Sequence, residues 1–135
     1  MNEQNTKDLF QGHSSHFIEM ASKTEKMERI NRPHAYSRKT GDCGDTVEFF
    51  LLGNKETITD IFFMVNGCMN TVASCNTVAA FAQGKSVEEA WDIKPEQVIE
   101  YLETLPEDHH HCAELAVGTF YLALVNLSTR KSWQY

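Results

Sequence analysis

Residues 46–66 read TVEFFLLGNKETITDIFFMVN. Two runs in this stretch, residues 46–52 and 58–66, are rich in β-branched and aromatic side chains, which favour strands. Between them, residues 53–55 are glycine, asparagine and lysine, a composition typical of a turn. The stretch therefore predicts an antiparallel hairpin, and residues 35–39 can add a third strand beside it.

Downstream of the hairpin the sequence becomes rich in small, helix-forming residues. A first segment stops at Gly84, a suitable helix C-cap. Ser86 with Glu89 forms a capping box, and Pro95 suits the first turn of a further helix. The helices expected here run over residues 69–83, from Ser86, from Pro95 to about 104, and over 110–127.

Upstream of the hairpin, apolar residues roughly follow the spacing of a helix: Phe17, Met20, Ala21, Met27 and Ile30. Ser14 or Ser15 can cap its start. Pro33 marks its end, because the residue before a proline avoids helical backbone angles. Helix, small sheet and then helices predict an α+β fold, with a three-stranded antiparallel sheet packed by helices.

Length and charge limit the classes of function. The chain has 135 residues, enough for one domain with a modest core. Its formal net charge of −7 argues against binding to nucleic acid, because binding to phosphates needs a basic surface. No apolar run of 18 residues is present, so we expect no membrane span. The first 15 residues lack a signal-peptide layout, and we therefore expect a cytoplasmic protein.

Four cysteines, Cys43, Cys68, Cys75 and Cys112, lie far apart, and no C-x-x-C pair is present. Taken singly, each could be a small buried apolar residue. Cys43, however, lies in a predicted loop, and Cys68 and Cys112 lie at predicted helix starts, where the helix dipole favours thiolate. If these three converge, three thiolates and one oxygen or nitrogen donor could bind zinc or the iron of a cluster.

Three cysteine segments resemble the motifs of the IscU/NifU family of iron–sulfur cluster assembly scaffolds: GDCGD at 41–45, NGCMNTVASCNTVAAFAQGKSVEEA at 66–90, and HHHCAELA at 109–116. The motifs occur in the family's order and with matching spacing, so the resemblance covers residues 25–127. It leaves residues 1–24 as an N-terminal segment with the start of the first helix, and residues 128–135 as a C-terminal tail.

The resemblance implies a function and a site. It implies a scaffold rather than an enzyme, which takes sulfur from a cysteine desulfurase, builds a labile cluster of the [2Fe–2S] type and passes it to apo-acceptor proteins. It implies that Cys43, Cys68 and Cys112 are cluster ligands and that Asp45 is the non-thiolate ligand. His111 is implied as an alternative ligand, and zinc as an occupant of the cluster-free form.

The sequence departs from the family's pattern in two places. Family members served by a dedicated Hsp70-type chaperone carry L-P-P-V-K before the third motif, whereas residues 105–109 here read LPEDH, so we do not expect that partner. Cys75 stands where the family usually has serine; we expect a core residue there, with a fourth sulfur near the site as the alternative. For His109 and His110 we expect a solvated surface pair.

A related branch, the SufU type, implies a different function, that of a zinc-bound sulfur acceptor with sulfurtransferase activity. That branch resembles this family but carries an insertion between its second and third cysteines. Here 43 residues separate Cys68 from Cys112, so the insertion is absent. The scaffold is therefore the favoured interpretation, and the sulfurtransferase remains the alternative.

Strand alternation also predicts an apolar patch on the outer face of the sheet, formed by Phe50, Phe62 and Met64. Such a patch is costly when exposed, so something should cover it. The favoured cover is the C-terminal tail with Trp133 and Tyr135, and the alternative is a second copy or a partner protein.

Overall fold

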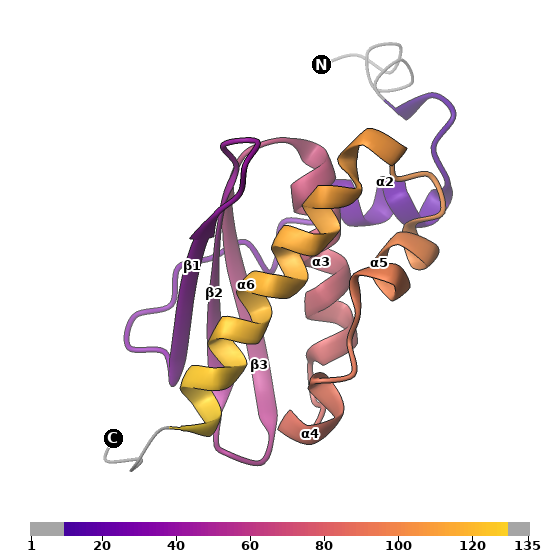
Figure 1. Ribbon diagram of the computed structural model, residues 1–135. Helices are drawn as coiled ribbons and strands as arrows, with labels where there is room; N and C mark the ends of the chain where they lie inside the picture. The colour runs from indigo at the N-terminus through magenta and orange to yellow at the C-terminus, as the bar shows by residue number, and fades with distance from the viewer. Residues whose placement is uncertain (1–9, 130–135) are drawn as a thin grey trace.

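The computed structural model describes residues 10–129 of the chain (Figure 1). Three strands form one sheet, and helices cover one of its faces. Within residues 10–129, none of the helices has the length and apolar character that crossing a membrane requires. The elements in chain order are α2 (Ser15–Ser22), β1 (Ala35–Thr40), β2 (Thr46–Gly53), β3 (Ile58–Asn66), α3 (Met69–Ala82), α4 (Val87–Ala90), α5 (Pro95–Leu102), the 3₁₀ turn η1 (Glu107–His109) and α6 (His110–Ser128).

The predicted three-stranded antiparallel sheet and the α+β class are confirmed. The strands lie in the order β1-β2-β3, with Phe49 opposite Phe63 in the β2–β3 register. Side chains alternate across the sheet as the sequence predicts, and most of one face of β2 and β3 is fully buried, with Val65 half-buried at its end. The fully buried residues of that face include Val47, Phe49, Leu51, Ile61 and Phe63.

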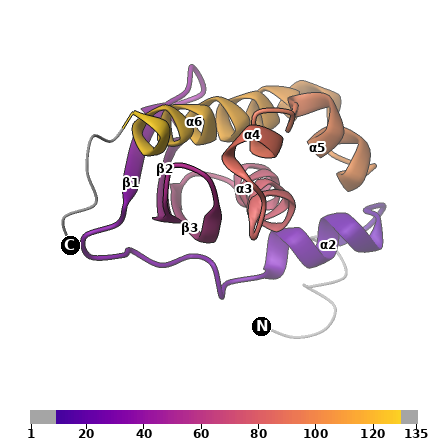
Figure 2. The same cartoon turned by 90° about the horizontal axis from the view of Figure 1, so that it is seen from below.

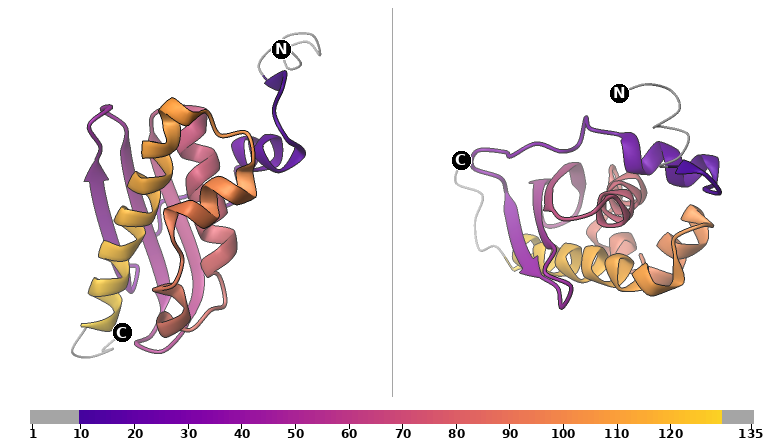
Figure 3. Two further views of the ribbon diagram at one scale, coloured as in Figure 1. Left: turned by 45° about the vertical axis from the view of Figure 1, so that its right-hand side comes forward. Right: turned by 90° about the horizontal axis from the view of Figure 1, so that it is seen from above.

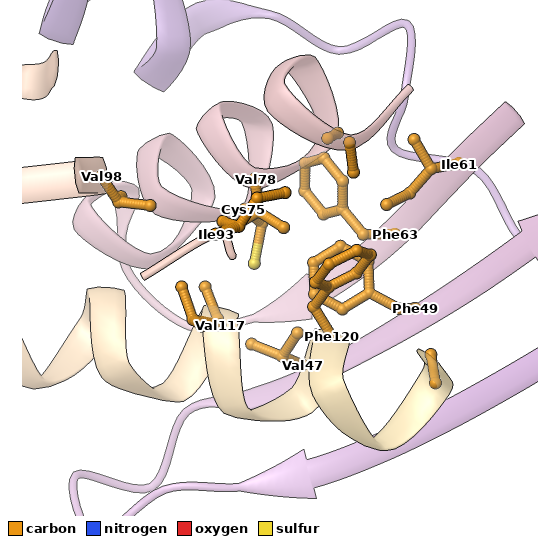
Figure 4. Close-up of a cluster of buried hydrophobic side chains, with 14 of the residues drawn as sticks. Val47, Phe49, Ile61, Phe63, Cys75, Val78, Ile93, Val98, Val117 and Phe120 are labelled. Carbon is orange, nitrogen blue, oxygen red and sulfur yellow. The ribbon is translucent and has the colours of Figure 1, made fainter. Parts of the chain in front are cut away.

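Helices α3 and α6 pack against this buried face and form the core between them and the sheet (Figure 4). Phe120 of α6 meets Phe49 edge-on, with ring centroids 5.8 Å apart. Full burial of each such ring is worth roughly 1.5–3 kcal/mol. The core therefore holds the sheet and both long helices in a fixed relation, and the ends of these elements become reliable places for functional side chains.

The helix boundaries downstream of the sheet follow the local signals. Gly84 ends α3 with a φ of 78°, an angle that favours glycine. Ser86 and Glu89 form the predicted capping box at the start of α4. Pro95 occupies the first turn of α5.

The first helix, α2, is shorter than the sequence predicts. Ser14 caps its start as expected, but the helix ends at Ser22, so Met27 and Ile30 do not belong to it. The buried side chain of Asn76 on α3 donates hydrogen bonds to the carbonyls of Met20, at 2.8 Å, and Lys23, at 3.0 Å. These bonds satisfy carbonyls at the end of α2 and let the chain leave the helix there.

Residues 23–34 run in a largely extended path across the outer face of the sheet to β1 (Figures 2 and 3). The carbonyl of Lys26 accepts a hydrogen bond from the Phe63 amide at 2.9 Å, which ties the start of this segment to β3. The prediction that Met27 belongs to the first helix is wrong. The backbone is extended here because it pairs with the free edge of β3.

The same segment covers much of the predicted outer apolar patch. Phe50 is buried, with the guanidinium of Arg29 5.8 Å from its ring centroid, and the Lys26 ammonium lies 4.9 Å from the centre of the Phe62 ring. Arg29 also forms an ion pair with Glu48, which is buried on this face. The predicted cover, the tail with Trp133 and Tyr135, lies outside the described residues.

Candidate metal centre

Three segments meet at one end of the sheet, at the top of Figure 1. They are the turn between β1 and β2, the junction of β3 with α3, and the first turn of α6. One side chain from each contributes to a compact group: Asp45, Cys68 and Cys112. A carboxylate oxygen of Asp45 and the two sulfur atoms all lie within 4.8 Å of one another.

This spacing is close to that of a bound metal ion. In a tetrahedral site, two thiolates bound to one zinc ion at about 2.3 Å each lie about 3.8 Å apart. The three atoms therefore need an inward movement of at most about 1 Å to share one ion. Two sulfurs and one oxygen also leave a fourth position of a tetrahedral set to be filled.

Cys43 lies beside this group but outside it. It occupies the exposed part of the β1–β2 turn, where the amide of Gly41 donates to the carbonyl of Asp45 at 2.9 Å. Gly44 has a φ of 92°, which a residue with a side chain rarely adopts. The Cys43 thiol is nevertheless near enough to influence the pKa values of both Asp45 and Cys112. It can therefore reach both solvent and the group through movement of this turn.

The carboxylate of Asp45 is held by hydrogen bonds on one side. Its Oδ2 atom accepts the hydroxyl of Thr71 at 2.6 Å and the backbone amide of Cys68 at 3.2 Å. Burial alone would raise the pKa of Asp45, but hydrogen bonds from Thr71 and from Cys68 outweigh it and lower that pKa. Asp45 is thus ionised at neutral pH and can bind a cation.

The two cysteines of the group differ in their surroundings. Cys68 is exposed and forms the N-cap of α3. Cys112 is buried, and this burial raises the pKa of its thiol to about 12, although an interaction with Thr71 acts in the opposite direction. Burial therefore keeps the Cys112 thiol protonated in the metal-free chain, contrary to the thiolate expected at a helix start. A bound metal would have to displace this proton.

The histidines lie at the edge of the site. The Nε2 atom of His111 is 3.7 Å from the sulfur of Cys112, but His111 is exposed and lies outside the compact group. Its ring stacks on His109 with centroids 5.8 Å apart, and Nδ1 of His109 lies within hydrogen-bond distance of Oδ1 of Asp108, at 3.0 Å. His109 and His110 are both half-buried, so the expected solvated pair is more enclosed than its polar sequence suggests.

Cys75 points into the core between α3 and the sheet (Figure 4). It is fully buried, and burial raises the pKa of its thiol well above the ordinary value. The expectation of a core residue is confirmed, and the compact group does not include its sulfur.

Replacing Cys75 by serine is expected to leave metal binding unchanged and to cost about 1–2 kcal/mol of stability. The cost arises because a hydroxyl would replace a thiol in apolar surroundings without a hydrogen-bond partner. Chemical denaturation would measure the stability, and zinc titration would measure binding. Loss of metal binding in a folded Cys75→Ser protein would contradict this assignment.

Sequence reasoning missed three residues that shape the site: Gly67, Asn70 and Thr71. Thr71 is fully buried and bonds Asp45, and the Asn70 amide nitrogen lies 3.8 Å from the sulfur of Cys68. The other side-chain atom of Asn70, Oδ1, is buried without a partner among the described residues. The available signal was the pair of polar residues in the first turn after Cys68, in a helix otherwise rich in small apolar residues.

Gly67 provides the space in which Asp45 lies. A Cβ atom at this position would be 2.3 Å from Cγ and 2.4 Å from Oδ2 of Asp45. We therefore expect Gly67→Ala to rotate Asp45 out of its position and to weaken zinc binding about tenfold, in the range typical of lost supporting contacts. Competition with a chromogenic chelator would measure the affinity.

The matched control is Gly118→Ala on α6, where the added atom would meet only the Lys39 ammonium at 3.8 Å. That change should leave zinc affinity unaltered and stabilise the helix by up to about 1 kcal/mol. Equal zinc affinities for the two variants would show that the position of Asp45 does not matter for binding.

The chain is similar to known proteins over most of its length. The family model described as the NifU-like N terminal domain matches residues 24–134. The Escherichia coli K12 iron–sulfur cluster assembly scaffold protein IscU is 33% identical over 90 residues, which are 66% of this chain and 70% of that protein. The Rickettsia prowazekii IscU is also 33% identical over 90 residues, covering 66% and 68% of the two chains.

Two Archaeoglobus fulgidus scaffold proteins, IscU 1 and IscU 2, are each 33% identical over 84 residues, 62% of this chain. The match spans only 55% of the length of either of them.

Solved structures show the same fold. A NifU-like protein, N-terminal part, from Brucella abortus aligns with a TM-score of 0.72 at 17% identity, covering 93% of this chain and 98% of that one. The SUF-system scaffold protein from Fervidobacterium islandicum AW-1, described as putative in its name, aligns with a TM-score of 0.70 at 20% identity, covering 82% and 95%. At these identities the likeness concerns the fold alone.

Proposed function

The chain belongs to the family of NifU-like N-terminal domains, and from this premise we propose that it is a scaffold on which iron–sulfur clusters are assembled and from which they are passed on. The observation that carries the proposal is the convergence of Asp45, Cys68 and Cys112. The turn beside them carries the exposed Cys43 together with two glycines. Relatives at 33% identity are named as scaffolds of this kind.

In this proposal the cluster is cargo, and Cys43, Cys68 and Cys112 are its thiolate ligands. Soft thiolates suit iron–sulfur clusters, and Asp45 adds a harder oxygen donor. A storage protein would use four thiolates, whereas a carrier has to release what it binds. The carboxylate is therefore the weak point of the ligand set. His111 can replace a ligand during exchange, because its ring reaches the sulfur of Cys112.

We propose Cys43 as the residue that receives sulfur. It is exposed on a turn outside the compact group, whereas Cys68 belongs to that group and Cys112 is buried and holds its proton. We propose that the Cys43 thiolate attacks the outer sulfur of a persulfide on a cysteine desulfurase. The sulfur–sulfur bond of the donor breaks, the desulfurase leaves as a thiolate, and Cys43 becomes the persulfide. An external electron donor then supplies the two electrons that convert this sulfur to sulfide.

The partners proposed are a cysteine desulfurase and apo-proteins that accept a cluster of the [2Fe–2S] type. Zinc is the proposed occupant of the cluster-free form, because the compact group has the dimensions of a single-ion site. A dedicated Hsp70-type chaperone is not proposed, since Glu107 and Asp108 stand within η1, where the recognised motif carries proline and valine.

Anaerobic reconstitution tests the proposal. The purified chain would be incubated with ferrous iron, cysteine, a cysteine desulfurase and a thiol reductant as the electron donor, and visible absorption would follow cluster formation. Subsequent mixing with an apo-ferredoxin should move the cluster to the acceptor, with loss of absorption in the first protein after separation. Cys75→Ser serves as the control that retains the site.

The alternative function, a zinc-bound sulfur acceptor, predicts a different result. The chain would retain one zinc ion, form no cluster and still carry persulfide sulfur away from the desulfurase. Mass spectrometry of the intact protein would detect that added sulfur. A chain that does this while failing to build or transfer a cluster is a sulfurtransferase and not a scaffold.

A further inference from the structure

The buried hydroxyl of Thr71 lies against the compact group. Thr71 is completely buried in the first turn of α3, and its Oγ1 atom is 2.6 Å from Oδ2 of Asp45 and 3.8 Å from the sulfur of Cys68. The same hydroxyl interacts with the thiol of Cys112. It thus faces all three side chains that the structure gathers for a metal, although threonine is not an expected metal ligand here.

A hydroxyl has one proton to donate and cannot serve all three neighbours equally. The short distance shows that it serves the carboxylate of Asp45. Together with the amide of Cys68, it occupies Oδ2 with two donors. The carboxylate is therefore fixed in orientation beside the two sulfur atoms of the group.

We propose that Thr71 is a positioning residue that holds the carboxylate of Asp45 in the orientation that binds the metal or cluster, and that keeps it in place while the site is empty. The inference rests on the proposed function for the identity of the cargo. Its physical claim is that Thr71 and Asp45 contribute to metal affinity together and not independently. Outer hydrogen-bond partners of this kind orient metal ligands, and their loss typically weakens binding about 10–100-fold.

The arrangement also explains how Asp45 can stay in the site when no metal is present. Asp45 extends from a turn that contains two glycines and contacts solvent, so its side chain would otherwise be free to rotate. Gly67 gives it a surface to lie on, and Thr71 gives it a short hydrogen bond. Because Thr71 orders the carboxylate before a metal binds, less conformational entropy is lost on metal binding.

A double-mutant cycle with cobalt(II) as the probe tests the inference. Thr71→Val keeps the size of the side chain and removes the hydroxyl, so we expect cobalt(II) affinity to fall about tenfold. Thr71→Ser keeps the hydroxyl and should stay close to the parent. In the Asp45→Ala background, Thr71→Val should have almost no further effect, because the group it positions is gone. The ligand-field bands of bound cobalt(II) should change in Thr71→Val as they do in Asp45→Ala.

Thr77→Val is the matched control. Thr77 is also fully buried on α3, but its hydroxyl donates to the carbonyl of Ala73 at 2.8 Å, away from the site. It should leave cobalt(II) affinity unchanged, and thermal unfolding would confirm that all variants are folded. An unchanged affinity in folded Thr71→Val, or the same tenfold loss with and without Asp45, would overturn the inference.

The two levels of proposal fail in different ways. A parent chain that binds cobalt(II) with the expected coupling but builds no cluster would overturn the scaffold function alone. A parent chain whose affinity does not depend on Asp45 would overturn the positioning role, whatever the outcome of cluster assembly.

Discussion

Cys68→Ser and Cys112→Ser are each expected to abolish stable cluster assembly while the fold survives. Both sulfurs belong to the compact group, and a neutral hydroxyl is a far poorer ligand for iron than a thiolate. Reconstitution followed by visible absorption would measure the loss, which should be at least about a hundredfold in retained cluster, at the upper end of what ligand changes cause.

Cys43→Ser is expected to have a different effect from the other two serine variants. Cys43 lies outside the compact group on an exposed turn, so Cys43→Ser should still bind a single zinc or cobalt(II) ion through the other three residues. It should nevertheless fail to accumulate persulfide sulfur and should build little cluster. Full, stable cluster in any one of the three serine variants would remove that residue from the proposed ligand set.

Stability measurements separate loss of a ligand from loss of the fold. Cys112 is buried in the first turn of α6, so its serine variant carries the larger risk of destabilisation. Cys112→Ala introduces no hydroxyl, so it avoids the cost of a buried polar group without a partner. It should remain folded even if the serine variant does not. Both variants should lack cluster if the sulfur is a ligand.

The elements that sequence reasoning predicted well are those set by local signals. The β2–β3 hairpin follows from alternation and a turn, and α4 follows from the capping box of Ser86 and Glu89. Each of these signals lies within a few residues of the structure that it determines. The three cysteine motifs could likewise be read from short segments, and the structure brings Cys68 and Cys112 together where helix starts meet the end of the sheet.

The features that could not be predicted depend on contacts between distant residues. The end of α2 is set by Asn76, more than 50 positions away, and the path of residues 23–34 is set by the edge of β3. Hydrophobic periodicity reflects only local spacing and not such contacts, so it wrongly places Met27 in a helix. The same holds for Thr71, which looks like an ordinary helical residue until the turn bearing Asp45 is placed against it.

Asp45→Ala is expected to hold an assembled cluster longer and to transfer it about 10–100-fold more slowly, in the range of changes to supporting groups at metal sites. The structure gives this expectation a specific reason. Asp45 is inside the compact group, whereas Cys43, two residues earlier on the same turn, is outside it. As the one oxygen donor of the proposed ligand set, the carboxylate leaves an iron atom more readily than the thiolates do, and its departure opens that iron to a ligand of the acceptor.

Without that carboxylate, the ligand set lacks its most exchangeable member, so exchange with an acceptor slows. The variant should at the same time bind a single cobalt(II) or zinc ion more weakly, because one of the three gathered ligands is missing. Asp45→Asn provides a graded comparison, since an amide oxygen keeps the shape but has no charge.

The decisive measurement is the rate of transfer to an apo-ferredoxin from equal amounts of loaded protein. Slower transfer together with weaker binding of a single ion would separate the kinetic role of Asp45 from its contribution to affinity. Equal or faster transfer from Asp45→Ala would show that the carboxylate only holds the cargo and does not assist its release. The exchange route would then have to use His111, whose ring already contacts the sulfur of Cys112.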